Sequence, residues 1–241
     1  MDAVKKPKIG LTNNQLKIIA MVSMLIDHIG LLFFTDVAIF RVLGRIAFPI
    51  FAYMIAEGCR YTKNKKKYLG IITAMALVFQ VVYFVAMQSL YQGILVTFSL
   101  AIITIYSIDT LRQTKKRKYR WLSAGMLLLV AVFVILFPIL FAEVGFAIDY
   151  GIWGLLIPVA VYFMPNKAWR VGSVTALLIA RGIYYTCVAY PVQWFSLLAI
   201  PFLALYNGER GKRKMKYVFY IFYPAHLVIL YGIAMLIQLL K

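Results

Sequence analysis

Long apolar stretches alternate with short polar segments from residue 16 to the end of the chain. A helix needs about 20 apolar residues to cross the hydrocarbon core of a bilayer. Read with a window of about 19 residues, the sequence predicts nine such helices, at 16–34, 37–57, 69–88, 92–110, 121–141, 147–164, 171–189, 192–206 and 217–240. The connection at 34–37 is very short, and 192–206 is thin for a span. We therefore predict an all-α polytopic membrane bundle of about nine helices, within a range of about eight to ten, that forms a single domain over residues 1–241.

Basic residues concentrate in the polar segments and predict how the chain is oriented. Loops on the cytoplasmic side of a membrane retain Lys and Arg. With the N-terminus inside, 22 of the 26 basic residues fall in predicted cytoplasmic segments, namely "KKPKIGLTNNQLK", "RYTKNKKK", "RQTKKRKYR", "NKAWR" and "NGERGKRKMK". The opposite loops contain no Lys or Arg: "TDV", "MQSLYQG", "AEVGFAIDYG" and "TCVAYPVQ". This alternation predicts a multi-pass protein of the cytoplasmic membrane with its N-terminus in the cytoplasm and its C-terminus outside.

Composition agrees with a membrane protein and excludes several functional classes. The chain is 63% hydrophobic and only 14% charged, a balance that soluble domains rarely reach. Its net charge of +18 is distributed over short clusters, so we expect contact with membrane lipids and no nucleic-acid partner. The clusters could attract an anionic phosphorylated cofactor or acidic lipid head groups from the cytoplasm. The two histidines lie on distant predicted spans and no His/Cys cluster has metal-ligand spacing, so we expect no metal site.

Polar side chains inside the predicted spans are the candidates for function, because an ionisable group in hydrocarbon costs roughly 2.5 to 3.5 kcal/mol. A rise of about 1.5 Å per residue puts four of them roughly 9 to 12 Å below the outer end of their spans: His28, Arg45, Gln80 and Arg181. Arg41 shares a helical face with Arg45, and Asp149 and Tyr150 lie at the outer mouth. We predict one polar cavity, lined by the first, second, third and seventh spans.

The adjacent residues Asp27 and His28, in "MLIDHIGLLFF", have different expected roles. They project about 100° apart on a helix and are not expected to bond each other. Asp27 is expected to pair with Arg45 or Arg181, which leaves the imidazole of His28 able to exchange a proton near neutral pH. His28 is therefore the best general-base candidate. The alternative interpretation is that these residues form structural polar bridges between helices.

Three further polar residues lie nearer the predicted cytoplasmic side. Glu57 and Arg60, in "YMIAEGCRY", are interpreted as an ion pair that snorkels to the interface or as part of a site. His226, in "FYIFYPAHLVIL", lies on the turn after Pro224. A proline frees a backbone carbonyl that a nearby side chain can satisfy, so His226 has both a structural and a functional interpretation.

Four segments, which cover nearly the whole chain in order, resemble the TraX family: "LKIIAMVSMLIDHIG", "FRVLGRIAFPIFAYMIAEGCRYTKNKKKYL", "DYGIWGLL" and "YNGERG…KYVFYIFYPAHL". TraX-like proteins are implicated in N-terminal acetylation of conjugative pilin and are distantly similar to transmembrane acyltransferases. The resemblance implies that acetyl-CoA or another acyl-CoA binds from the cytoplasm and that its acyl group reaches an amine or hydroxyl acceptor near the outer face.

The same resemblance implies roles for individual residues. The histidine of the "DH" pair, His28, would be catalytic and Asp27 would support it. Together with the side chains selected above by their depth and their place at the outer mouth, the candidates for substrate binding are Arg41, Arg45, Gln80, Asp149, Tyr150 and Arg181. The candidates for binding the acyl-CoA are Glu57, Arg60 and His226. The acceptor stays open between a peptide such as a pilin N-terminus, a glycan and a lipid.

Two other functional classes fit the same residues. A transporter or flippase for an anionic solute would use the arginines as ligands and Asp27 with His28 as a proton relay. A membrane assembly factor without enzymatic activity would use the polar residues only to hold its helices together.

Overall fold

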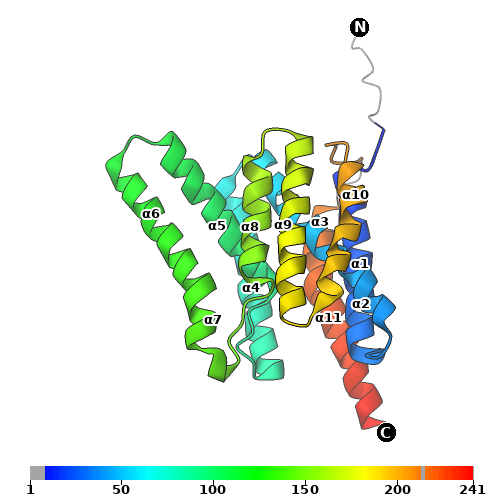
Figure 1. The fold of residues 1–241 in the computed structure, drawn as a ribbon. Helices are drawn as coiled ribbons and strands as arrows, with labels where there is room; N and C mark the ends of the chain where they lie inside the picture. The colour runs from blue at the N-terminus through cyan, green and yellow to red at the C-terminus, as the bar shows by residue number, and fades with distance from the viewer. Residues whose placement is uncertain (1–8, 213–214, 241) are drawn as a thin grey trace. The chain divides into compact units, whose positions relative to one another are not determined.

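The structure is a computed structural model that describes residues 9–212 and 215–240, and their regular structure is helical apart from two isolated backbone bridges (Figure 1). The longer helices are α1 (Asn13–Phe33), α3 (Ala47–Tyr61), α4 (Lys65–Met87), α5 (Ile94–Gln113), α6 (Arg117–Ala131), α8 (Gly151–Phe163), α9 (Lys167–Cys187) and α11 (Lys216–Leu239). Shorter elements lie between them: α2 (Ala38–Gly44), the π-helix η1 (Val132–Leu136), α7 (Phe137–Leu140), and the 3₁₀ helix η2 (Ala142–Val144), followed later by the 3₁₀ helix η3 (Pro191–Ala199) and α10 (Ile200–Ala204).

Each of the nine predicted ranges contains helical structure, which confirms the all-α class of a multi-pass membrane protein. Within the described residues, six stretches are long and apolar enough to cross a membrane: Asn13–Phe33, Ala38–Tyr61, Lys65–Val85, Ile94–Gln113, Arg117–Leu140 and Ile221–Leu239. Two apolar stretches are shorter, Gly151–Phe163 and Pro191–Ala204. The count of nine spans and the side of the N-terminus therefore stay predictions.

Two of the predicted helices are interrupted at identifiable residues. Pro138 has no N–H to donate to the preceding turn, and the helix widens just before it, where Phe137 N donates to Val132 O across the π-helical η1. The predicted span 192–206 is instead mostly the 3₁₀ helix η3. Three residues per turn place every third side chain on one face. In η3 that face is buried and carries Gln193, Ser196 and Ala199.

The chain divides into two compact units, residues 1–51 with 178–241 and residues 52–177. The boundaries fall inside α3 and α9, so each of these helices contributes to both units. In the first unit, α1 packs against α2 and α11, and α2 contacts η3 (Figure 1). The segment before α1 is fixed to residues 205–207, because Leu11 N donates to Leu205 O at 2.8 Å and Asn207 N donates to Leu11 O at 2.9 Å.

The second unit is built around α5, which packs against α4, α6 and α8 (Figure 1). Ala101, Ile102 and Ile105 on α5 are completely buried. Within this unit the connections before α4, after α5 and after α8 lie at one end, and those before α5 and before α8 lie at the other (Figure 1). The first set carries the basic segments and the second set carries no Lys or Arg. In the second unit, the loops rich in Lys and Arg therefore lie at one end and the loops without Lys or Arg lie at the other. The orientation prediction expects this distribution.

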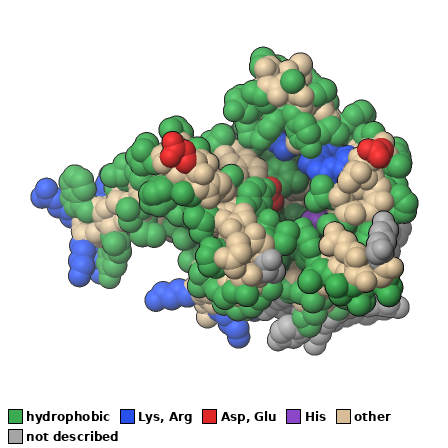
Figure 2. Space-filling view, turned by 90° about the horizontal axis from the view of Figure 1, so that it is seen from below, with side chains coloured by type: hydrophobic (Ala, Val, Ile, Leu, Met, Phe, Trp, Pro, Cys, Tyr) green, Lys and Arg blue, Asp and Glu red, His purple; other side chains and the backbone are tan. Residues whose placement is uncertain are grey.

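Much of the surface is apolar, as expected for a chain surrounded by lipid. Val78, Val81 and Val85 form an exposed stripe at helical spacing along α4, and Figure 2 shows hydrophobic side chains over most of the face in view. Buried polar side chains therefore have to find partners inside the protein, since lipid offers none.

The two native cysteines provide a test of the predicted orientation. Cys187 is exposed at the end of α9 and Cys59 is buried in α3. We expect a membrane-impermeant maleimide added to intact cells to label the wild-type chain at Cys187, with Cys187→Ser abolishing the label. Labelling that occurs only after the membrane is permeabilised would show that the orientation is reversed.

Candidate functional site

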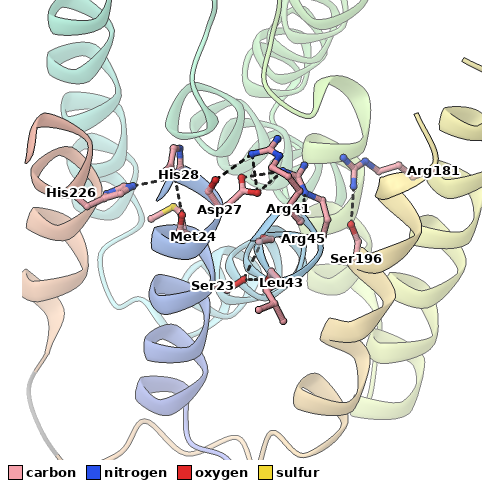
Figure 3. Close-up of polar contacts among 11 residues, drawn as sticks. Ser23, Met24, Asp27, His28, Arg41, Leu43, Arg45, Arg181, Ser196 and His226 are labelled. Atoms are coloured by element: carbon pink, nitrogen blue, oxygen red, sulfur yellow. Dashed lines mark hydrogen bonds and ion pairs between the residues drawn. The ribbon is translucent and has the colours of Figure 1, made fainter. Parts of the chain in front are cut away.

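An ion cluster in the first unit joins α1 to the α2–α3 junction. The Asp27 carboxylate on α1 accepts from Arg41 Nη1 at 2.9 Å and from Arg45 Nη2 at 2.8 Å, both at Oδ1 (Figure 3). Arg45 Nη2 also lies 3.0 Å from Asp27 Oδ2, and Arg45 Nε donates to Arg41 O at 3.3 Å. One carboxylate and two guanidinium groups leave this trio with one excess positive charge, which makes it suited to an anionic ligand.

The cluster depends on a very close approach between α1 and α2. A Cβ atom added at Gly44 would lie 2.1 Å from Asp27 Oδ1, and one added at Gly30 would lie 2.2 Å from the Cβ of Phe40. Ser23 fastens the end of α2 to α1, because its hydroxyl donates to Leu43 O at 2.5 Å. The small residues therefore permit the two helix backbones to approach closely enough for the charges to meet.

The only two histidines of the chain lie beside each other in the first unit (Figure 3). Nε2 of His226 on α11 lies 3.4 Å from Nδ1 of His28 on α1, and the ring centroids are 5.0 Å apart. Each Nδ1 also lies 2.8 Å from the carbonyl oxygen four residues earlier, which belongs to Met24 for His28 and to Phe222 for His226. The packing of α1 on α11 therefore joins residues 198 positions apart.

Arg181 belongs to the same unit and is almost completely buried, at 2% exposure. Its Nη1 donates to Ser196 Oγ on η3 at 3.2 Å. The guanidinium also lies over the rings of Phe48 and Tyr185, at 5.3 Å and 5.1 Å from the centroids. Aromatic faces and a hydroxyl are favourable surroundings for a buried guanidinium.

The first unit thus contains six of the predicted site residues: Asp27, His28, Arg41, Arg45, Arg181 and His226. The predicted pairing of Asp27 with Arg45 is confirmed. Arg41, which was expected to share a face with Arg45, also binds this carboxylate. The second partner of Asp27 is thus Arg41, whereas the hydrogen bond found for Arg181 is to Ser196.

Gln80, Asp149 and Tyr150 belong to the second unit, where they organise two loops. Gln80 Nε2 donates to Tyr91 O at 2.8 Å, and the Tyr91 hydroxyl donates to Asp149 Oδ1, also at 2.8 Å. Tyr150 adopts a left-handed conformation, with φ of 59°, directly before α8. A single cavity that joins these residues to the arginines stays a prediction.

Glu57 and Arg60, interpreted from sequence as an ion pair or as part of a site, each contact a different segment. Glu57 is buried and accepts from Arg170 Nη1 on α9 at 3.2 Å. Arg60 Nη2 instead donates to carbonyl oxygens at the end of α8, those of Val161 at 3.2 Å, Tyr162, and Met164 at 3.3 Å. The last carbonyls of a helix have no partner within it and attract cations, so Arg60 binds the α8 terminus and Glu57 binds the next helix.

Sequence reasoning missed a second polar cluster in the second unit. Asp109 on α5 is buried and its Oδ2 accepts from Lys65 Nζ at 2.9 Å and from the Tyr162 hydroxyl at 2.6 Å. Asp109 lies near the end of a predicted span and is one of only eight acidic residues in the chain. That scarcity was the available signal, and the contacts tie α4 and α8 to α5. Among the residues that the structure describes, no three His, Cys, Asp or Glu side chains gather as a metal site.

Comparison with known proteins places this chain in a family. A family model described as "TraX protein" matches residues 12–234, which includes the ion cluster and both histidines. The chain belongs to the TraX family.

This TraX-family chain is similar to two other bacterial proteins. It is 27% identical over 247 residues to "Probable fimbrial assembly protein FimC, serogroup H1" of Dichelobacter nodosus, a match that covers 93% of this chain and 96% of that protein. It is 40% identical over 65 residues to "Uncharacterized protein RP591" of Rickettsia prowazekii (strain Madrid E), which covers 25% of this chain and 26% of that protein. No solved structure matches the chain.

The close approach of α1 and α2 can be tested with Gly44→Ala. The added methyl group would collide with the Asp27 carboxylate, so we expect a loss of about 1 to 3 kcal/mol of stability, measured as a lower melting temperature in detergent. Gly232→Ala on α11, where an added Cβ meets nothing within 4 Å, is the matched control and should leave the melting temperature equal or slightly higher. Equal melting temperatures for both variants would contradict this account of the cluster.

Proposed function

We propose that this TraX-family protein is a membrane-embedded acyltransferase, which moves an acetyl or other acyl group from acyl-CoA to an amine or hydroxyl acceptor. The observation that carries the proposal is the adjacency, on α1, of a histidine to a carboxylate that already binds two arginines. This combination offers a base and cationic groups for a developing negative charge in one place. Acyl transfer from a thioester needs both.

The base in this proposal is His28. The Asp27 carboxylate is occupied by guanidinium groups, and the Nδ1 edge of the imidazole faces Met24 O. Nε2 then takes the proton of the acceptor while the acceptor nitrogen or oxygen bonds to the thioester carbonyl carbon. The carbon–sulfur bond breaks, and the departing sulfur of CoA receives the proton from the imidazolium.

The two arginines have different roles in this proposal. The Arg45 side chain is 7% exposed and holds Asp27 through both carboxylate oxygens, so it maintains the structure. The Arg41 side chain is 24% exposed, so it is the guanidinium that a ligand can reach. A well-placed donor to the oxyanion is commonly worth about 3 to 4 kcal/mol of barrier, and we assign that role to Arg41.

The acceptor class is proposed from a relative. The protein from Dichelobacter nodosus is described as a fimbrial assembly protein, so an N-terminal amine of a pilus subunit or of another envelope protein is the first acceptor to test. A glycan or lipid hydroxyl could undergo the same chemistry, because the proposed steps require only a nucleophile with a transferable proton. Acetyl-CoA is the first donor to test.

A transporter or flippase for an anionic solute is the second candidate. The observation in its favour is the excess positive charge of the trio formed by Asp27, Arg41 and Arg45. Liposome-reconstituted protein that moves an anion across the membrane without releasing CoA would favour this candidate. Release of CoA without net flux would eliminate it.

The proposal predicts that His28→Ala abolishes transfer while the protein stays folded. The assay combines acetyl-CoA, purified protein in nanodiscs and a short peptide with a free N-terminus, and measures CoA thiol release and peptide mass. We expect a loss of about 10² to 10⁴-fold, whereas Asp36→Asn in the exposed loop after α1 should retain activity. A peptide that is already acetylated has no free N-terminal amine. In its presence, the protein should release no CoA above background. Undiminished transfer by His28→Ala would refute the assigned base.

The different roles proposed for Arg41 and Arg45 lead to a separate prediction. Arg45→Gln removes the more buried partner of Asp27 and is expected to cost about 3 kcal/mol of stability, seen as a lower melting temperature. Arg41→Gln should lower kcat more than 10-fold while shifting the melting temperature less than Arg45→Gln does, since its ion pair is more exposed. The reverse ranking of the two variants in melting temperature would show that their roles are exchanged.

A further inference from the structure

The contact between His28 and His226 fixes where the hydrogens of both rings lie. A carbonyl oxygen only accepts hydrogen bonds, and each Nδ1 lies 2.8 Å from one. Both Nδ1 atoms therefore carry a hydrogen, and in a neutral ring the Nε2 atom carries none. The single Nδ1–H of His28 is therefore shared between two acceptors, Met24 O at 2.8 Å and Nε2 of His226 at 3.4 Å.

The ring of His226 is held in place to receive this hydrogen. It is buried, and it stacks on Phe222 with centroids 4.8 Å apart and ring planes 8° apart. Tyr223 approaches its edge, at 5.9 Å between centroids. These contacts restrict rotation of the imidazole, so its bare Nε2 points steadily toward α1.

We propose that His226 is a positioning residue, which acts with the Met24 carbonyl to hold His28 in the tautomer whose Nε2 is bare and faces the acceptor. The inference rests on the proposed function, because it assigns His226 a task in the same proton transfer. Asp27, the carboxylate next to His28 in sequence, is engaged by two guanidinium groups. The orienting partners of the imidazole are accordingly Met24 O at 2.8 Å and Nε2 of the second histidine at 3.4 Å.

The histidine pair also stabilises the positive charge that forms on His28 during transfer. When Nε2 of His28 takes the acceptor proton, the ring becomes an imidazolium with hydrogens on both nitrogens. Its Nδ1–H bond to Nε2 of His226 then strengthens, because a charged donor makes a stronger hydrogen bond. The proton on Nε2 leaves to the sulfur of CoA, and both rings return to their starting tautomers. His226 neither gains nor loses a proton over the cycle.

Nitrogen-15 NMR can read the tautomers directly, because the chain has only two histidines. We would label histidine with nitrogen-15 in protein without a His tag and assign His28 from the spectrum of His226→Gln. In neutral wild-type protein we expect Nδ1 of His28 to be protonated and Nε2 to be bare. In His226→Leu, which removes the acceptor on α11 and leaves Met24 O in place, we expect the Nδ1 resonance of His28 to shift and the tautomer protonated at Nε2 to gain population. A wild-type His28 protonated at Nε2, or resonances unchanged in His226→Leu, would overturn the proposal.

Kinetics separate a positioning role from a purely structural one. Gln at position 226 places a carboxamide oxygen near the former Nε2 and preserves an acceptor, whereas Leu preserves only bulk. We expect His226→Leu to lower kcat by about 10² with KM within about twofold, and His226→Gln to recover most of that loss. Equal losses in both variants, or a loss that follows melting temperature alone, would count against the inference.

The two proposals fail in distinguishable ways. Wild-type protein that shows the expected tautomers but transfers no acyl group would refute the proposed function and the catalytic task of His226, while the hydrogen-bond assignment would stand. Wild-type protein that transfers acyl groups, with His226→Leu fully active, would uphold the proposed function and refute the positioning role.

Discussion

The interaction of the Asp27 carboxylate with two guanidinium groups is the constraint on which the rest of the first unit depends. Neither charge type is stable alone in an apolar interior, so α1 and α2 have to pack where these groups can meet. Gly44 removes the Cβ that would prevent it. The chain turns at Arg45, between α2 and α3. This turn directs the Arg45 side chain back toward Asp27 on α1.

The same interaction determines what is left for His28. A carboxylate that accepts from two arginines has little capacity to orient an imidazole on the adjacent residue, which projects in another direction along the helix. α11 brings the second histidine to the Nδ1 edge of that imidazole. One helix therefore contributes a carboxylate to the ion cluster and an imidazole to the histidine pair.

Much of this arrangement is predictable from sequence, and the rest depends on contacts between distant segments. The long apolar stretches located helical structure in each of the nine predicted ranges, and the cost of burying charge predicted that Asp27 would pair with Arg45 or Arg181. Which helices are neighbours is not encoded in local pattern, so the contact between His28 and His226 could not be derived. The Glu57–Arg60 pair was inferred from sequence proximity, but the α8 carbonyls and Arg170 were better partners. The 3₁₀ winding of η3, which places Ser196 opposite Arg181, has no clear apolar period to reveal it.

The rigidity of the cluster bears on the choice between enzyme and transporter. A transported anion has to be bound and then released, so its ligands exchange partners during each cycle. Arg45 is nearly buried, bonds both oxygens of Asp27 and is enclosed by a helix contact that does not accommodate one extra methyl group. Fixed charges of this kind are useful where they stabilise a transient state without reorganising. The packing of α1 against α2 therefore supports the proposed acyltransferase over the proposed transporter.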